Sequence, residues 1–218
     1  MLDAIDKHRL AAILCADVVG YSRLMAADEE ATVAALGELR SLVARSVPEH
    51  RGRLVDFTGD NFLAEFPSAL AAVHCALALR DAVAESHADL PPERRMQLRM
   101  GMHLGEVRAE GERIYGDGVN IAARLEALAK PGGLCLSSAI RDQVATRLEL
   151  DFEDLGERTL KNIPAPVRAW QLRHGGGQRP AQAAAVSLGR RLAWPVLVLV
   201  LLGALIVLEG PIHCGIPK

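Results

Sequence analysis

Two aspartates in this sequence stand where carboxylates could bind divalent cations. Asp17 lies near the end of a continuous apolar run over residues 10–19, and Asp60 lies in a turn-like segment, residues 58–61, between two short strand-like stretches. A carboxylate at the end of a buried strand needs a partner or a metal ion. Paired aspartates near a backbone carbonyl suit two Mg²⁺ ions, which prefer oxygen ligands and leave room for substrate phosphates. The alternative is that both are ordinary turn residues, which Asp60 alone would favour.

A second pair of polar residues lies in a later segment that predicts a short helix. Asn120 and Arg124 are four residues apart within residues 116–129, so they share one face of that helix. Asparagine is a poor residue inside a helix, which suggests a functional reason for Asn120. Arginine keeps its charge and offers a fork of donors that suits phosphate groups, although Arg124 alone could equally be a solvated charge.

The positions of these residues are set by strand-like and helix-like segments, which alternate up to about residue 173. The apolar run at 10–19 is typical of a buried central strand, and Asp28, Glu29 and Glu30 favour the start of a helix. The pattern predicts strands at residues 10–19, 53–57, 62–66, 98–107, 134–136, 152–160 and 167–172, and helices from residue 28, over 67–87, within 116–129 and over 138–148. The predicted fold class is α+β, a ferredoxin-like βαββαβ sandwich with a mostly antiparallel sheet and a C-terminal extension.

Composition narrows the classes of function. The 218 residues carry a net charge of −2 and only 4% of them are aromatic, whereas nucleic-acid-binding domains usually need a clustered basic face and stacking platforms. We therefore expect no nucleic acid partner. The four cysteines form no CxxC pair and have no zinc-ligand spacing with histidine, so we expect no structural zinc site.

Three segments resemble the signatures of the class III adenylyl/guanylyl cyclase catalytic domain. They are ADVVGYS at residues 16–22, TGDNFLAEF at residues 58–66 and YGDGVNIAARLE at residues 115–126. Their order and spacing also match, and the resemblance covers residues 9–173. It implies an enzyme that converts a purine nucleoside triphosphate into a 3′,5′-cyclic nucleotide and pyrophosphate.

The resemblance also implies roles for individual residues. Asp17, Asp60 and the backbone carbonyl of Val18 match the positions that hold two Mg²⁺ or Mn²⁺ ions in the family. Such ions activate the ribose 3′-hydroxyl and neutralise charge on the triphosphate. A generic metal-dependent phosphohydrolase is a weaker alternative, because the sequence offers no evident general base.

The remaining family residues match positions on a second copy of the chain. Asn120 matches the residue that positions the ribose, Arg124 the one that stabilises the charged transition state, and Lys161 the one that contacts the triphosphate. Family geometry places these three on one subunit and the metal aspartates on the other. The resemblance therefore implies a head-to-tail homodimer with two equivalent sites at its interface.

Two positions depart from the family pattern. Asp56 stands where adenylyl cyclases typically carry Lys, and Arg113 stands where they typically carry Asp or Thr. Adenine offers an acceptor at N1 and a donor at N6, whereas guanine offers donors at N1 and N2 and an acceptor at O6, so the exchanged charges match guanine. If Asp56 and Arg113 instead pair with each other, neither reads the base. We expect an adenylate cyclase that uses ATP; the alternatives are a guanylyl cyclase that uses GTP, and a degenerate domain that binds nucleotide or dimerises.

The C-terminal part of the sequence has a different composition. A Gly-, Gln- and Ala-rich stretch over residues 174–191 predicts a flexible linker, and residues 192–208 are uncharged and almost purely Leu, Val and Ala. Such a run predicts one C-terminal transmembrane helix, with a buried core helix as the alternative. Arg190 and Arg191 precede it, which predicts that the residues before it are cytoplasmic. The predicted organisation is a cyclase domain at 1–173, a linker at 174–191, a membrane-spanning helix at 192–208 in contact with lipid, and an extracytoplasmic tail at 209–218, which resembles a bacterial subgroup anchored in the inner membrane.

Overall fold

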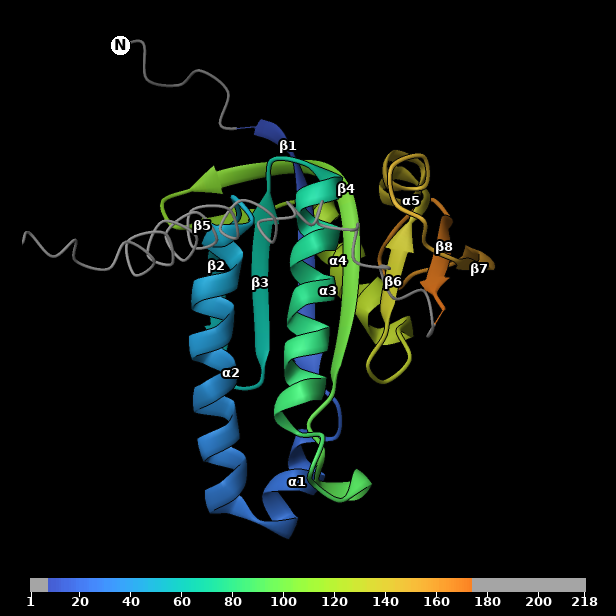
Figure 1. Ribbon diagram of the computed structural model, residues 1–218. Helices are drawn as coiled ribbons and strands as arrows, with labels where there is room; N and C mark the ends of the chain where they lie inside the picture. The colour runs from blue at the N-terminus through green and yellow to red at the C-terminus, as the bar shows by residue number, and fades with distance from the viewer. Residues whose placement is uncertain (1–7, 174–218) are drawn as a thin grey trace, which may run out of the picture. The chain divides into compact units, whose positions relative to one another are not determined.

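A computed structural model describes residues 8–173 of the chain (Figure 1). These residues form one eight-stranded sheet in the order β2-β3-β1-β4-β6-β8-β7, with β5 paired to β4. The strands are β1 (His8–Val18), β2 (Arg53–Thr58), β3 (Asn61–Phe66), β4 (Leu98–Glu110), β5 (Arg113–Tyr115), β6 (Leu134–Ser137), β7 (Phe152–Arg158) and β8 (Val167–Leu172). The helices are α1 (Tyr21–Ala27), α2 (Glu29–Glu49), α3 (Ala69–Ser86), α4 (Asp117–Leu128) and α5 (Ser138–Val144), with a 3-10 turn η1 at Pro92–Arg94.

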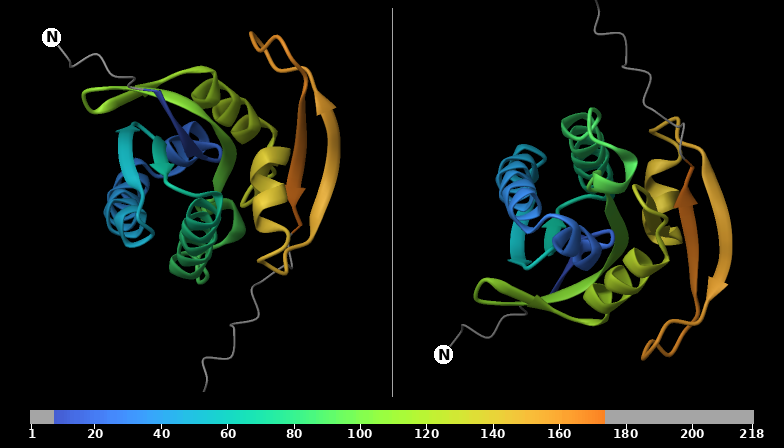
Figure 2. Two further views of the ribbon diagram at one scale, coloured as in Figure 1. Left: turned by 90° about the horizontal axis from the view of Figure 1, so that it is seen from above. Right: turned by 90° about the horizontal axis from the view of Figure 1, so that it is seen from below.

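Strand β1 is the centre of the fold. It pairs with β3 on one side and with β4 on the other, both antiparallel, and the residues from Ala11 to Ala16 are all buried. Helices cover both of its faces, with α2 and α3 on one side and α4 on the other (Figures 1 and 2). A strand covered on both faces cannot alternate apolar and polar residues, which explains the continuous apolar run in the sequence.

The two long helices begin where their sequences favour a helix start. The Asp28 carboxylate accepts a hydrogen bond from the backbone N–H of Ala31 at 3.1 Å at the start of α2. The Ser68 hydroxyl does the same for Ala71 at 3.2 Å at the start of α3. Each cap satisfies a backbone donor that the helix itself cannot pair. Both helices then bury their apolar residues against the same face of the sheet.

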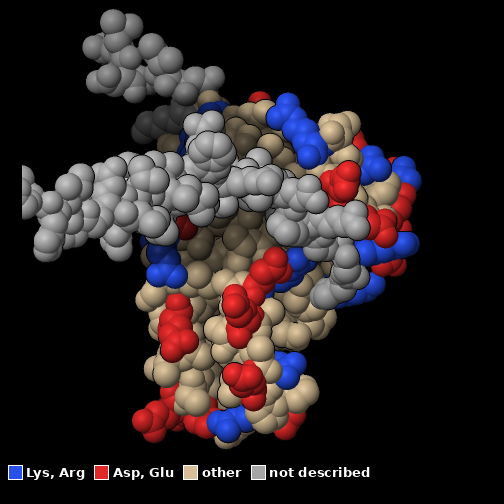
Figure 3. Space-filling model, in the orientation of Figure 1, with Lys and Arg blue, Asp and Glu red and all other residues tan. Residues whose placement is uncertain are grey.

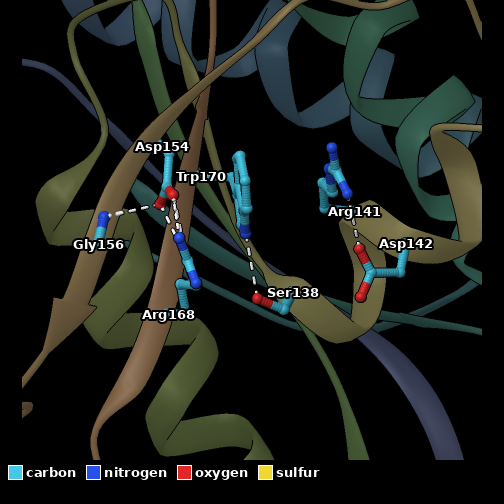
Figure 4. Close-up of polar contacts among 7 residues, drawn as sticks. All are labelled: Ser138, Arg141, Asp142, Asp154, Gly156, Arg168 and Trp170. Carbon is cyan, nitrogen blue, oxygen red and sulfur yellow. Dashed lines mark hydrogen bonds and ion pairs between the residues drawn. The ribbon is translucent and has the colours of Figure 1, made fainter.

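The outer end of the sheet is held to α5 by a tryptophan. Trp170 of β8 donates from Nε1 to the Ser138 hydroxyl at 3.1 Å (Figure 4). The guanidinium carbons of Arg141 and Arg168 lie 4.4 and 5.5 Å from the centroid of its ring, within the range of cation–π attraction. Arg168 is also paired with Asp154 of β7. These contacts tie β7, β8 and α5 into one unit.

Two short elements were not predicted from the sequence. Helix α1 has seven residues and follows Gly20, whose φ of 64° lies in the left-handed region; β5 has three residues. Elements this short contain too few residues for a periodic apolar pattern to identify them. Helix α5 also ends at Val144, whereas the sequence predicted a helix to residue 148.

The predicted fold class needs a correction, because it joined the sandwich to a C-terminal transmembrane helix. Among residues 8–173, no helix combines the length and the apolar character that crossing a membrane requires. The predicted linker, span and tail at residues 174–218 lie outside the described residues. The described fold is a mixed α+β sheet whose longest helices, α2 and α3, bury their apolar residues in the core and leave acidic and basic side chains interspersed on the face seen in Figure 3.

Candidate active site

The structure brings Asp17 and Asp60 to the same edge of the sheet. Asp17 is the second-last residue of β1, and Asp60 lies in the turn between β2 and β3. Because β1 and β3 are antiparallel neighbours, Asp17 lies opposite Asn61. The backbone N–H of Val18 donates to the carbonyl oxygen of Asp60 at 3.2 Å. The sequence argument for two converging carboxylates therefore has a structural basis in this strand pair.

Arg99 binds the Asp17 carboxylate directly. It lies opposite Asp17 on β4, and its guanidinium donates from Nε to Oδ1 at 3.0 Å and from Nη2 to Oδ2. The Oε1 atom of Glu126, on α4, lies 3.5 Å from Arg99 Nε. The sequence analysis missed both Arg99 and Glu126. The signal available for Arg99 was a single charge inside the otherwise apolar start of β4.

Glu126 lies close enough to the two aspartates for their charges to affect its protonation. Burial, together with the neighbouring Asp17 carboxylate, raises the pKa of Glu126 to about 7, and Asp60 acts in the same direction. Glu126 Oε1 is buried without a hydrogen-bond partner among the described residues. The carboxyl groups of Asp17, Asp60 and Glu126 thus influence one another beside the guanidinium of Arg99, and a divalent cation bound by Asp17 and Asp60 would reduce their repulsion.

A cation here would need oxygen ligands besides carboxylates. Within residues 8–173, no group of three His, Cys, Asp or Glu side chains is arranged to hold a metal ion by itself. Asp17 and Asp60 would therefore have to be joined by a backbone carbonyl, for which Val18 is adjacent, or by substrate oxygens. Mg²⁺ is commonly bound in this way, through one or two carboxylates plus phosphates.

Close packing of α4 on the sheet sets the position of Glu126. Gly101 of β4 lies under the helix, and a Cβ built there would be 2.0 Å from the Glu126 nitrogen and 2.3 Å from the Ala122 carbonyl oxygen. Only glycine allows the two backbones to approach so closely. The helix can therefore place Glu126 beside the Asp17–Arg99 pair.

Asn120 and Arg124 lie on a different side of α4 from Glu126. Both side chains are exposed, and neither makes a hydrogen bond or ion pair with any other residue of the described part of the chain. Arg124 and Glu126 are two residues apart, which separates them by about 200° around the helix. Since Glu126 faces the Asp17 carboxylate of its own chain, Arg124 points away from it.

A β-bulge orients Asp56. Leu54 pairs with Ala64, but Asp56 pairs with Leu63, so one extra residue is inserted in β2 at Val55. Ala64 belongs to the core under α2 and α3, whereas Leu63 packs with the cluster under α4. The extra residue therefore turns Asp56 to the face that carries Asp17. Its carboxylate accepts hydrogen bonds from the Thr58 hydroxyl at 3.0 and 3.1 Å.

Arg113 and Lys161 lie elsewhere in the chain. Arg113 is exposed on β5, and the β4–β5 hairpin is tied to β2 by Arg53, which donates from Nη1 to the Glu112 carbonyl at 2.8 Å. Among the ion pairs of residues 8–173, none joins Asp56 to Arg113. Lys161 is exposed in the loop between β7 and β8, at the opposite end of the strand order from β2. One chain therefore does not bring Lys161 to the aspartates.

Comparison with known proteins identifies similar chains. A family model described as "Adenylate and Guanylate cyclase catalytic domain" matches residues 4–174. The chain is 47% identical over 165 residues to "Putative adenylate cyclase 3" of Rhizobium meliloti (strain 1021), an alignment that covers 75% of this chain and 28% of that protein. It thus spans less than a third of the length of this relative.

Solved structures of cyclases have a similar fold. The crystal structure of an adenylate/guanylate cyclase/hydrolase from Silicibacter pomeroyi matches with a TM-score of 0.72 and 39% identity, and covers 77% of this chain and 98% of that one. The adenylyl cyclase CyaB from P. aeruginosa matches with a TM-score of 0.67 and 22% identity, over 79% of this chain and 96% of that one. At that identity the second match shows the fold alone.

Proposed function

The chain belongs to the adenylate and guanylate cyclase catalytic domain family, and we propose on this basis that it converts ATP into 3′,5′-cyclic AMP and pyrophosphate. The observation that carries the proposal is the meeting of Asp17 and Asp60 at one edge of the sheet, where their carboxylates also raise the pKa of the neighbouring Glu126. A degenerate domain would have no need to keep such charge together, because buried like charges cost free energy without a ligand.

Asp17, Asp60 and the Val18 carbonyl are the groups that would hold two Mg²⁺ or Mn²⁺ ions. Such ions supply Lewis acidity toward the ribose 3′-hydroxyl and the triphosphate when they are bound. The chain's own contribution is positioning: β1 and the β2–β3 turn fix the two carboxylates relative to each other through the Val18–Asp60 backbone hydrogen bond. Positioning and charge stabilisation supply most of the rate enhancement in phosphoryl transfer.

The geometry of α4 supports a site shared between two copies of the chain. Arg124 and Asn120 are exposed and point away from the Asp17 of their own chain. In a head-to-tail homodimer, Asn120 would orient the ribose and Arg124 would donate to phosphoryl oxygens at the partner's aspartates, with Lys161 reaching the triphosphate. Each of the two equivalent sites would then take its metal ligands from one chain and these three residues from the other.

ATP is the proposed substrate even though the charges at Asp56 and Arg113 are exchanged relative to adenylyl cyclases, because the pair still offers one acceptor and one donor. The Asp56 carboxylate can accept from the adenine N6 amino group, and Arg113 can donate to N1. The relative with 47% identity is also named an adenylate cyclase. GTP is the second candidate, and the orientation of Asp56 favours it: the bulge turns this carboxylate toward the face that carries Asp17, where guanine N1–H and N2–H could donate to it.

Replacing the metal aspartates tests the activity. We expect Asp17→Asn and Asp60→Asn each to lower the rate of cyclic nucleotide formation by roughly a thousandfold or more, because each removes a charged ligand that acts in the transition state. Asp89→Asn is the matched control, since Asp89 is exposed in the loop after α3 and belongs neither to β1 nor to the β2–β3 turn. Product is measured by chromatography and assembly by light scattering. Near-normal turnover in either variant, with dimers intact, would contradict the proposal.

The choice of base is tested separately. The measurement is kcat/KM for ATP and for GTP in the wild type and in the double variant Asp56→Lys/Arg113→Asp. A wild type that prefers ATP supports the proposed substrate. A wild type that prefers GTP, with a shift toward ATP in the double variant, would show that Asp56 and Arg113 read guanine; each unmet polar group at a buried base edge costs about 1–3 kcal/mol.

A further inference from the structure

The Asp17 carboxylate is fully engaged by a residue of its own chain. Both of its oxygens accept hydrogen bonds from Arg99, and the side chains of Asp17 and Arg99 are only 15% and 34% exposed. Bidentate arginine–carboxylate pairs are among the strongest polar contacts in proteins. A cation that takes an oxygen of Asp17 must therefore compete with this guanidinium.

A second acceptor for Arg99 lies next to the first. Glu126 Oε1 is 3.5 Å from Arg99 Nε, too far for a good hydrogen bond, and this oxygen is buried without a hydrogen-bond partner in the described part of the chain. A buried carboxylate oxygen left unpaired is costly. A small movement of the guanidinium away from Asp17 and toward Glu126 would satisfy that oxygen.

We propose that Arg99 is an internal counter-cation: it holds the Asp17 carboxylate when no metal ion is bound, and it moves to Glu126 when a divalent cation takes Asp17. The inference rests on the proposed metal-binding role of Asp17. It gives Arg99 and Glu126 the function of positioning residues that set the affinity for metal. In both states Asp17 faces a cation, and after the exchange the displaced guanidinium lies closer to Glu126 Oε1, the oxygen that lacks a hydrogen-bond partner among the described residues.

The proposal predicts a gain of metal affinity when Arg99 is removed. Free Mn²⁺, measured by its electron paramagnetic resonance signal, reports binding to the full-length protein without nucleotide. We expect Arg99→Ala to bind Mn²⁺ with a Kd about tenfold or more below that of the wild type, because a competing positive charge in a partly buried site is gone. Arg147→Ala is the matched control, since Arg147 is exposed in the turn after α5, and its Kd should equal that of the wild type.

The role of Glu126 is tested by a double-mutant cycle. Glu126→Gln should weaken Mn²⁺ binding in the wild-type background, where it removes the negative charge that would hold the displaced guanidinium, and it should weaken binding much less in the Arg99→Ala background. Thermal unfolding gives a second measurement. Without metal, Arg99→Ala should melt below the wild type, and saturating Mn²⁺ should raise its Tm by more.

If Arg99 merely supports the fold, its removal should lower the affinity for Mn²⁺ and not raise it. A purely structural Arg99 would leave Asp17 poorly placed on removal, so equal or weaker Mn²⁺ binding by Arg99→Ala refutes the exchange. If Arg99→Ala fails to fold, Arg99→Lys keeps the charge but not the fork, and it must bind Mn²⁺ more tightly than the wild type. Wild-type binding that is lost in Asp17→Asn upholds the metal site even where the exchange fails, whereas a lack of Mn²⁺ binding by wild type and Arg99→Ala alike refutes both.

Discussion

Mixing an Asp17→Asn protein with an Arg124→Ala protein should restore activity that neither protein has alone. The reason is the geometry of α4, on which Glu126 faces the Asp17–Arg99 pair of its own chain while Arg124 is about 200° away around the helix and exposed. If each site combines Asp17 of one chain with Arg124 of the other, a mixed dimer has one site with both lesions and one site with neither.

The activity expected in the mixture follows from the number of intact active sites. With free exchange and equal amounts, half of the dimers are mixed and half of the sites in each mixed dimer are intact, so activity should reach about a quarter of the wild-type value per chain. Varying the ratio should give a parabola with its maximum at equal amounts. If Arg124 served its own chain, every site in a mixed dimer would carry one lesion and no activity would return.

The assay is cyclic nucleotide formation after the two proteins have been incubated together. Mixed dimers are counted by capturing one protein through a tag and detecting the other. A mixture of Asp17→Asn with Asp60→Asn is the matched control, because both lesions lie in the same half of the site and no intact site can form. If the Asp17→Asn and Arg124→Ala mixture forms mixed dimers but is no more active than the control mixture, the shared site is refuted.

Three further predictions concern stability, each measured by urea or thermal unfolding. Gly101→Ala should cost about 1–3 kcal/mol or more, because its Cβ would lie 2.0 Å from the α4 backbone, whereas the control Gly37→Ala, with open space around it in α2, should gain up to about 1 kcal/mol. Burial holds the pKa of His103 below its ordinary 6.5, so the unfolded chain binds more protons in acid than the folded chain does. The free energy of unfolding should therefore fall as the pH drops through about 6.5, and His103→Gln should make this dependence on pH weaker. Trp170→Phe should cost about 1–2 kcal/mol through the lost hydrogen bond to Ser138 and weaker cation–π contacts; a change below 0.5 kcal/mol, roughly the size typical of a surface substitution, would contradict it.

Much of the fold could be predicted because local signals and tertiary packing agree. The apolar run of β1, the caps at Asp28 and Ser68 and the turn around Asp60 each point to the element that forms. The neighbouring positions of Asp17 and Asp60 also follow from the order β1-α2-β2-β3, which makes β1 and β3 partners. The membrane-spanning helix was the part of the predicted fold class that had to be corrected, and it rested on an apolar run and its flanking residues, without packing against the rest of the chain.

Other features of the site depend on contacts between segments distant in sequence. The bulge at Val55, which decides the face on which Asp56 lies, has no Gly or Pro to mark it. Arg99 looks like an isolated strand charge until the β1–β4 register places it opposite Asp17, 82 residues away. Glu126 reaches that pair only because Gly101 lets α4 lie close on β4. A single sequence gives residue types but not register, and register determines these three contacts.

Helix α4 connects the two halves of the proposed enzyme. Its inner face carries Glu126, which meets Arg99 and Asp17 of the same chain, and its outer face carries Arg124, which the proposed dimer presents to the partner's aspartates. Because one rigid helix carries both residues, a shift that brings Glu126 closer to a displaced Arg99 also moves Arg124. The tight contact at Gly101 limits how far α4 can move, so in the proposed exchange the guanidinium of Arg99 moves and the helix stays in place.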